Sequence, residues 1–361
     1  MELCLHIGTE KTGSTALQGF LRDNRERLKQ QSVAVSASLG DPNHIAVPLL
    51  MLEHGGQRAH VAKWLTFPNS DTSDLAGHCL DQLIQEGALR SNKLIISSEH
   101  IFSFSTDLEA VHRLQSFCES VSNDIKIIVY LRPQDKLVPS LLSSRVRSGE
   151  SPSMEHIISN TPWLYYDRVL ENLSKTFGKE RIMVRAYSGA RLISNFLNAI
   201  SVSEKGLKTD IERTNQSLDR VQIEILKGLN DRIPAFIDGI RNPIRTGLVD
   251  FVAANKLGPP LGLSKEQKEM VHLLYEDSNN RLKEEFPLAD GFQFFTDKTS
   301  SLPSNPSDDI LWKDGALDLL AELWLDAKIT QATLNDQWTV KRVARGVLRR
   351  VRNGLKRTPT K

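Results

Sequence analysis

Residues 3–15 read LCLHIGTEKTGST, and this stretch decides the fold. The apolar run from Leu3 to Ile7 predicts a short buried strand. A glycine-rich loop follows at 8–13, and apolar residues at helical spacing from Ser14 to Lys29 predict a helix. Backbone N–H groups at the start of a helix bind anions, and glycines allow close approach. The stretch therefore predicts a phosphate-binding strand–loop–helix unit.

The loop differs from a Walker A loop, GxxxxGK[ST], in the position of its lysine. Gly8 and Gly13 keep the glycine spacing, but Ser14 follows the second glycine and the lysine lies inside the loop, at Lys11. Hydroxyl donors surround that charge: Thr12, Ser14 and Thr15. The pattern argues against a nucleoside triphosphate with magnesium. The alternative is a glycine-rich turn with a solvated lysine.

Three further apolar runs, at 93–98, 125–131 and 181–187, predict strands. Helical patterns lie between and after them, among others at about 165–177 and 265–285. Strands alternating with helices predict a parallel sheet in a three-layer α/β domain. Ligands bind such sheets at the carboxyl ends of the strands.

A second anion anchor is predicted after the strand at 125–131. Arg132 follows that strand directly, where a guanidinium suits phosphate oxygens. Ser140 is expected two turns into the next helix, facing back toward the arginine. The alternative reading of Arg132 is a structural ion pair.

Together, KTGST at 11–15 and YLRPQDKLVPSLLSSRVRSG at 130–149 resemble the family of sulfotransferases that use 3′-phosphoadenosine 5′-phosphosulfate (PAPS). The resemblance is to the branch with bacterial and carbohydrate enzymes, and covers roughly residues 3–295. Further similar stretches are YYDRVLENLSKTFGKERIMVRAY at 165–187 and RTNQSL at 213–218. This sequence departs from the family in two places. The residue after Ser140 is often aromatic in the family but is Leu141 here, and the KGxxGDWK-type loop of the cytosolic small-molecule enzymes is missing. Both departures argue against a phenol or steroid acceptor.

The resemblance implies a P-loop-like fold and transfer of a sulfuryl group from PAPS to an acceptor hydroxyl or amine. We expect no metal, because such transfer depends on positioning and electrostatics and the sequence shows no convincing carboxylate pair for magnesium. The resemblance also implies that the first loop holds the 5′-phosphosulfate, through Lys11, Thr12, Gly13, Ser14 and Thr15. Arg132 and Ser140 would hold the 3′-phosphate. We expect Lys11 to stabilise or protonate the bridging oxygen as its bond to sulfur breaks. Candidates for further nucleotide contacts are Tyr187, beside the adenine, and Asn215 and Ser217.

The acceptor's proton requires a base, and two candidates follow the strand at 93–98. Glu99 and His100 lie where the acceptor is expected, and the family uses either residue type. Glu99 is our first choice, and the alternative is that Ser98 or Glu99 caps the next helix. His44, in a loop after the first helix, is a candidate acceptor contact.

We expect a catalytic domain at 1–300, a linker rich in Ser, Pro and Asp at 301–309 and a helical extension at 310–361. The tail at 340–361 has nine Lys or Arg residues and no acidic residue. It predicts a basic amphipathic helix that binds an anionic membrane surface or a polyanion. The alternatives are a disordered end or a helix packed on the catalytic domain.

The composition limits the partners and the compartment. A net charge of +2 gives no strong overall field, and we expect no specific nucleic acid. Three widely spaced cysteines argue against a disulfide framework and a zinc site. Since no signal peptide or membrane span is predicted, we expect a cytoplasmic protein, with the tail as a peripheral contact to the inner membrane surface.

The resemblance favours a carbohydrate or glycolipid acceptor. Two other functions stay open. One is a P-loop kinase-like phosphotransferase that uses ATP-magnesium, and the other is a non-catalytic nucleotide-binding module.

Overall fold

A computed structural model describes residues 1–53, 58, 61, 74–209, 217–237, 240–255, 258–287 and 294. The chain forms two compact units. Of the described residues, the first unit holds those within 1–142, 153–217 and 265–294, and the second holds those within 143–152 and 218–264. The candidate site residues that the structure describes all lie in the first unit. Asn215, the linker at 301–309 and the extension at 310–361 with its basic tail lie outside the described residues, so their roles stay predictions.

The first unit is built on a five-stranded sheet in the order β2-β3-β1-β4-β5. All four pairings are parallel, which confirms the expected α/β class. The strands are β1 (Glu2–His6), β2 (Val33–Val35), β3 (Lys93–Ser97), β4 (Asp124–Leu131) and β5 (Ile182–Ala186). β1 occupies the centre of the sheet, between β3 and β4.

Helices cover both faces of this sheet. The helices of the first part of the unit are α1 (Ser14–Asp23), α2 (Arg25–Gln30), α3 (Ala46–Leu50), α5 (Leu75–Gln85), η1 (Ala88–Arg90), α6 (His100–Phe104) and α7 (Leu108–Val121). Those of the later part are α9 (Met154–Ser159), η2 (Pro162–Leu164), α10 (Tyr166–Phe177), η3 (Lys179–Arg181), α11 (Leu192–Ala199) and α14 (Lys265–Glu285). α8 (Gln134–Ser148) begins in the first unit and ends in the second.

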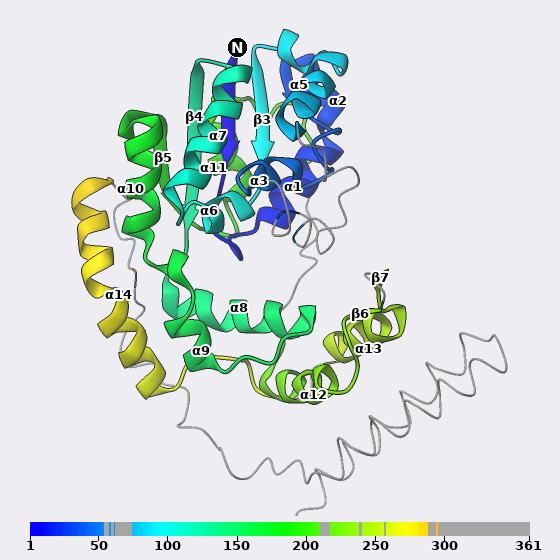
Figure 1. Ribbon diagram of the computed structural model, residues 1–361, viewed down its shortest axis with the longest axis vertical. Helices are drawn as coiled ribbons and strands as arrows, with labels where there is room; N and C mark the ends of the chain where they lie inside the picture. The colour runs from blue at the N-terminus through cyan, green and yellow to red at the C-terminus, as the bar shows by residue number, and fades with distance from the viewer. Residues whose placement is uncertain are drawn as a thin grey trace, which may run out of the picture. The chain divides into compact units, whose positions relative to one another are not determined.

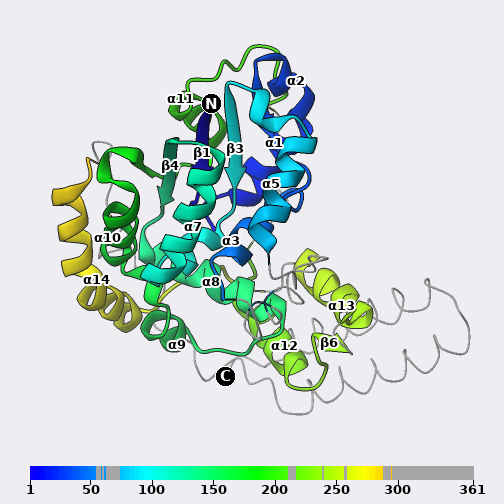
Figure 2. The same cartoon turned by 45° about the horizontal axis from the view of Figure 1, so that its top comes forward.

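Two apolar layers hold the helices to the sheet. On one face, residues of α1, α2 and α11 form a buried cluster with alternate residues of the strands, such as Cys4, Ile95 and Ile128. On the other face, α7 lies across the strands and packs against α3, α5 and α10 (Figures 1 and 2). Strand residues that alternate with those of the first cluster are fully buried there, among them Leu3, Leu5, Leu94 and Ile127. The three-layer arrangement predicted from the alternation of strands and helices is therefore confirmed.

The predicted helix at 14–29 is wrong in one respect, because it is interrupted at Asn24. The Asn24 amide nitrogen donates to the carbonyls of Phe20 and Lys208, and its amide oxygen accepts from the Lys208 N–H. An asparagine side chain that bonds backbone groups in this way competes with helix continuation. Strand β2 was not predicted, because three residues are too few for a clear pattern.

α14, which matches its predicted bounds, is fixed to the first unit by buried polar contacts. Gln134 and Asn279 exchange two side-chain hydrogen bonds, of 2.9 and 3.2 Å. Buried Asp167 accepts a 2.7 Å hydrogen bond from Nε of exposed Arg281 and forms an ion pair with it, with 2.6 Å between Nη2 and Oδ2. These bonds satisfy polar groups that would otherwise be costly to bury.

The second unit is a helical unit with a short hairpin. It contains α12 (Arg220–Asn230), β6 (Phe236–Ile237), β7 (Ile240–Arg241) and α13 (Pro243–Ala254). Asp219 and Gln222 form a capping box at the start of α12. Buried Arg245 donates to the carbonyls of Val146 and Arg147 and, over 2.6 Å, to Asn230, which ties the last turn of α8 to α12 and α13. Among the helices described in either unit, none has the length and apolar character needed to cross a membrane.

Replacing Asn24 tests its role at the helix break. Asn24→Ala leaves the Lys208 backbone groups without their partner, so we expect the free energy of unfolding to fall by about 1–3 kcal/mol. Exposed Asn198, also in the helical layer, is the matched control, and Asn198→Ala should change it by less than about 0.5 kcal/mol. Urea unfolding measures both variants, and an equal effect of the two would contradict the assignment.

Candidate functional site

The candidate residues gather at the carboxyl edge of the sheet. β1 pairs with β3 and β4 in a register that places His6 beside Ser97 and Ile128. The loop after β1 therefore lies between the ends of its two neighbours. In Figure 1 the arrowhead of β3 points to this edge, and the N-terminus lies at the opposite one. Lys11, Glu99 and Arg132 thus follow three adjacent strands.

The loop is held by bonds to β4 and within itself. The Thr9 N–H donates to the carbonyl of Tyr130 (3.2 Å), and the buried Thr12 hydroxyl donates to the carbonyl of Thr9 (2.6 Å). Lys11 and Gly13 adopt positive φ, of 64° and 77°. Because Gly13 is the N-cap of α1, no side chain caps the first N–H groups of this helix. Such a start favours an anion.

Both glycines of the loop are required by close packing. A Cβ atom on Gly13 would lie 2.7 Å from Leu192 Cδ2 and 3.1 Å from the Tyr187 ring. A Cβ atom on Gly8 would lie 2.9 Å from His6 Nε2 and 3.0 Å from Thr12 Oγ1. The loop thus packs against His6 at Gly8 and against Leu192 and Tyr187 at Gly13.

Arg132 bonds directly to the loop. Its Nη1 donates to the carbonyl of Lys11 over 3.0 Å, and its Cζ lies 5.9 Å from the centre of the Tyr187 ring. The side chain is half-buried, and this burial lowers the pKa of Arg132 from its ordinary value. The main chain is fixed as well, since Tyr166 donates to the Arg132 carbonyl and the Tyr187 N–H to that of Leu131. The two predicted anion anchors therefore share one edge and are in contact.

The remaining nucleotide candidates differ in exposure. Ser140 is buried in α8, two turns after Arg132, as predicted. Ser14 is buried at the start of α1, Thr15 and Ser217 are exposed, and Tyr187 is half-buried. The Thr12 hydroxyl donates within the loop, so its contact with a nucleotide stays a prediction without support in this geometry.

Glu99 and His100 lie at the start of α6. Glu99 is the N-cap residue, but no side-chain hydrogen bond caps this helix, so the capping alternative is not what the structure shows for Glu99. Instead, the Gln18 amide donates to Glu99 Oε2 over 2.7 Å. His100 is half-buried as the first residue of the helix. The geometry thus links Glu99 to α1, the helix that follows the glycine-rich loop.

His44 has a structural role in this geometry. It is 1% exposed, and its Nε2 lies 3.0 Å from the Ser36 carbonyl while its Nδ1 lies 3.0 Å from the Ser97 N–H nitrogen. Burial lowers the pKa of His44 from its ordinary value. These bonds hold its loop against the end of β3, and the predicted contact with an acceptor has no support here.

Sequence reasoning missed a buried polar layer beneath the loop. Fully buried His6 shares a 2.8 Å hydrogen bond between Nδ1 and the Ser97 hydroxyl, and burial lowers the pKa of His6 to about 4. Its Nε2, which faces Gly8, has no hydrogen-bond partner within the part of the chain that is described. Gln18 is 3% exposed on the core face of α1. A polar residue inside an apolar helical stripe, next to a glycine-rich loop, is the sequence signal that could have revealed this layer.

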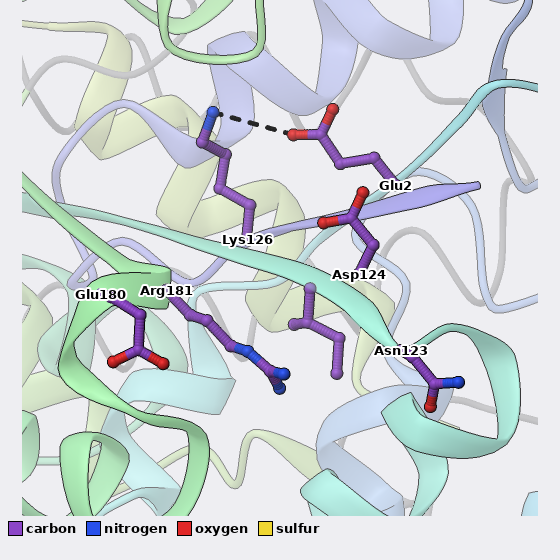
Figure 3. A pocket seen from close by; sticks show the side chains of 7 residues that line it. Glu2, Asn123, Asp124, Lys126, Glu180 and Arg181 are labelled. Carbon is purple, nitrogen blue, oxygen red and sulfur yellow. Dashed lines mark ion pairs between the residues drawn. The ribbon is translucent and has the colours of Figure 1, made fainter.

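A hollow of about 500 Å³ lies at the opposite, amino-terminal edge of the sheet (Figure 3). It is lined by Glu2, Asn123, Asp124, Ile125, Lys126, Glu180 and Arg181, and Lys126 pairs with Glu2 over 3.7 Å. Glu2 and Asp124 start β1 and β4, the strands whose other ends carry the loop and Arg132, so the hollow is separate from the candidate site. No cluster of three or more potential metal-ligating side chains occurs among the residues for which the structure gives positions.

Comparisons with known proteins give little further guidance. No family model matches the sequence, and no curated protein is similar to it. A sulfotransferase from Alicyclobacillus acidocaldarius is 12% identical, with a TM-score of 0.39 over 62% of this chain and 90% of that chain. A structure of the PezAT chromosomal toxin–antitoxin system of Streptococcus pneumoniae is 13% identical, with a TM-score of 0.25, and the match covers 79% of this chain and 87% of that chain. At these scores neither likeness establishes a shared fold or activity.

The close packing at Gly13 makes a direct prediction. Gly13→Ala places a methyl group at a positive φ and against Leu192, so we expect a loss of more than about 1 kcal/mol in the free energy of unfolding. Gly19, in the same helix with open space around it, is the matched control. Gly19→Ala should raise the free energy of unfolding by about 0.5–1 kcal/mol. Denaturant unfolding measures the free energy of unfolding of both variants. If Gly13→Ala is more stable than the wild type, the positive φ and close packing described for Gly13 are wrong.

The buried His6 predicts a pH dependence of stability. The pKa of His6 is about 6.5 in the unfolded chain and about 4 in the folded protein, so below pH 6.5 the unfolded state binds the extra proton. For one such group, the free energy of unfolding falls by about 2 kcal/mol from pH 7 to pH 5. His44, with its lowered pKa, acts in the same direction. His6→Asn should remove the His6 share of this fall in urea titrations at the two pH values, and an unchanged pH dependence would show the prediction wrong.

Proposed function

We propose that this protein is a sulfotransferase that uses PAPS as its sulfuryl donor. The observation that carries the proposal is the contact between the two anion anchors, in which the Arg132 guanidinium bonds the Lys11 carbonyl over 3.0 Å. A doubly phosphorylated adenosine needs one site for its 5′ end and another, close by, for its 3′-phosphate. A pair of anchors at opposite edges of the sheet would have contradicted this function.

The residues at the edge fit such a donor. The glycine-rich loop and the uncapped start of α1 offer N–H groups for the 5′-phosphosulfate. A guanidinium has five N–H donors, so the bond to Lys11 leaves others for the 3′-phosphate, with Ser140 two turns further on. The Tyr187 ring lies against both Gly13 and Arg132, which suits it to contact the nucleoside between the two anionic ends. Asn215 and Ser217 stay proposed contacts.

The proposed chemistry needs positioning and charge stabilisation. Lys11 would stabilise the negative charge that develops on the oxygen between phosphorus and sulfur as the S–O bond breaks. A carboxylate at Glu99, or the imidazole of His100, would accept the proton of the acceptor as its oxygen or nitrogen bonds to sulfur. The products are the sulfated acceptor and 3′,5′-ADP, and transfer of this kind depends mostly on orientation.

The acceptor is proposed from the family resemblance alone, as a carbohydrate or glycolipid. The two alternatives make different predictions. An ATP-magnesium phosphotransferase would need a lysine after the second glycine, where this chain has Ser14. A non-catalytic nucleotide-binding module would need no base, yet an acidic side chain is fixed beside the loop, at Glu99.

Calorimetry with Arg132 variants tests the proposal. Wild-type protein should bind 3′,5′-ADP without metal and more tightly than ATP-magnesium. Arg132→Ala should weaken 3′,5′-ADP binding roughly 10- to 100-fold, because a charge-assisted bond contributes about 1.5–3 kcal/mol. Arg181→Ala, at the opposite edge of the sheet, is the matched control and should leave the affinity unchanged.

Lys11→Ala should nearly abolish sulfuryl transfer, since the charge on the leaving oxygen would lose its main partner. Preference for ATP-magnesium in the wild type would favour the phosphotransferase instead. If Arg132→Ala and Arg181→Ala bind 3′,5′-ADP equally tightly, Arg132 does not hold the 3′-phosphate.

A further inference from the structure

We propose that Gln18 is a positioning residue that fixes the Glu99 carboxylate beside the phosphate loop. The inference rests on the proposed function, because it takes Glu99 rather than His100 as the base. It adds a physical link between the helix that starts at the donor loop and the group that activates the acceptor.

The contact is direct and buried on the Gln18 side. Gln18 Nε2 donates to Glu99 Oε2 over 2.7 Å and lies 3.4 Å from the Ser97 carbonyl oxygen. Gln18 is 3% exposed, whereas Glu99 is half-buried. Both acceptors lie at the end of β3, so one amide group joins α1 to that strand end.

A glutamine suits this position chemically. Its amide nitrogen has two N–H donors and no charge. A lysine would neutralise the carboxylate and weaken it as a base, and a glutamate would repel it. The bond to a charged oxygen is stronger than one between neutral groups. Because Oε2 is held, the direction of the second oxygen, Oε1, is set as well.

The strand end that carries Glu99 is itself held from two sides. The Ser97 hydroxyl bonds His6 Nδ1, and the Ser97 N–H donates to His44 Nδ1. The Ser98 N–H donates to the carbonyl of His6. Since the backbone before Glu99 is fixed, the remaining freedom lies in its side chain, and Gln18 restrains that.

The helix that presents Gln18 begins at the loop. α1 starts at Ser14, directly after Gly13, and Gln18 follows one turn later. The N–H groups at the start of α1 and the amide that holds Glu99 are therefore parts of one rigid element. We infer that the loss of Gln18 lowers the rate of transfer because it frees Glu99, and that nucleotide binding, which uses the start of α1, stays intact.

Kinetics of Gln18→Met test this role. Transfer from radiolabelled PAPS to octyl β-glucoside and octyl β-galactoside would be measured, together with 3′,5′-ADP binding by calorimetry. Gln18→Met should lower kcat roughly 10- to 100-fold, as expected for a misplaced catalytic group, with 3′,5′-ADP affinity within about two-fold of wild type. Gln30→Met, on the exposed face of α2, is the matched control and should leave both unchanged.

A double-mutant cycle shows whether Gln18 acts through Glu99. In a Glu99→Gln background, Gln18→Met should cause no further loss of kcat, because the group that it positions is already absent. Retained 3′,5′-ADP binding verifies folding, and Gln18→Leu replaces Gln18→Met if the latter does not fold.

The outcomes separate the two proposals. If the wild type transfers sulfate and Gln18→Met leaves kcat unchanged, the positioning role is wrong and the sulfotransferase assignment stands. The same holds if the effects of Gln18→Met and Glu99→Gln on kcat are independent. If the wild type neither transfers the sulfuryl group of PAPS to either glycoside nor releases sulfate from PAPS, the proposed function is wrong, and this inference with it.

Discussion

The hydrogen bond from the Arg132 guanidinium to the carbonyl of Lys11 joins the loops that follow the adjacent strands β1 and β4. Arg132 is itself fixed, since its carbonyl accepts from Tyr166 and its side chain lies against Tyr187. It therefore supports a loop in which Lys11 and Gly13 have positive φ. The same guanidinium has further N–H donors, so in the proposed function one residue shapes the first anion anchor and provides the second.

A layer of buried polar side chains supports this edge from below. His6, Ser97 and His44 connect the loop's strand to the end of β3, and Gln18 extends the layer to Glu99. Buried polar groups are costly unless they are bonded, so such a layer tolerates few alternative arrangements. Burial also keeps His6 uncharged at neutral pH, which avoids a cation beneath the loop. The layer thus restrains the loop between Gly8 and Gly13 and holds the Glu99 carboxylate at the same edge of the sheet.

Much of the framework could be predicted from the sequence, because strong local patterns decide it. The β-branched run at 125–131 became β4, and the loop between Gly8 and Gly13 follows β1 as expected. The break at Asn24 could not be predicted, since it depends on a bond to Lys208, far along the chain. His44 looked like a loop histidine, and only its tertiary contacts show that it is buried.

The proximity of Lys11 and Arg132 could be predicted from the sequence, whereas the buried side chains that support them could not. Lys11 and Arg132 follow strand signals, so the parallel-sheet rule alone brings them to one edge. Their direct contact depends on side-chain packing around Tyr187, which no local pattern encodes. Gln18 and His6 stand within apolar stripes, and their partner, Ser97, comes from a different strand. Polar residues at such positions next to a binding loop are the signal to use in similar sequences.

A crystal structure of the complex with 3′,5′-ADP tests the central claim most directly. We expect the 5′-phosphate on the loop between Gly8 and Ser14, and the 3′-phosphate within hydrogen-bonding distance of the Arg132 guanidinium. A nucleotide bound elsewhere, or a 3′-phosphate that lies away from Arg132, would contradict the account.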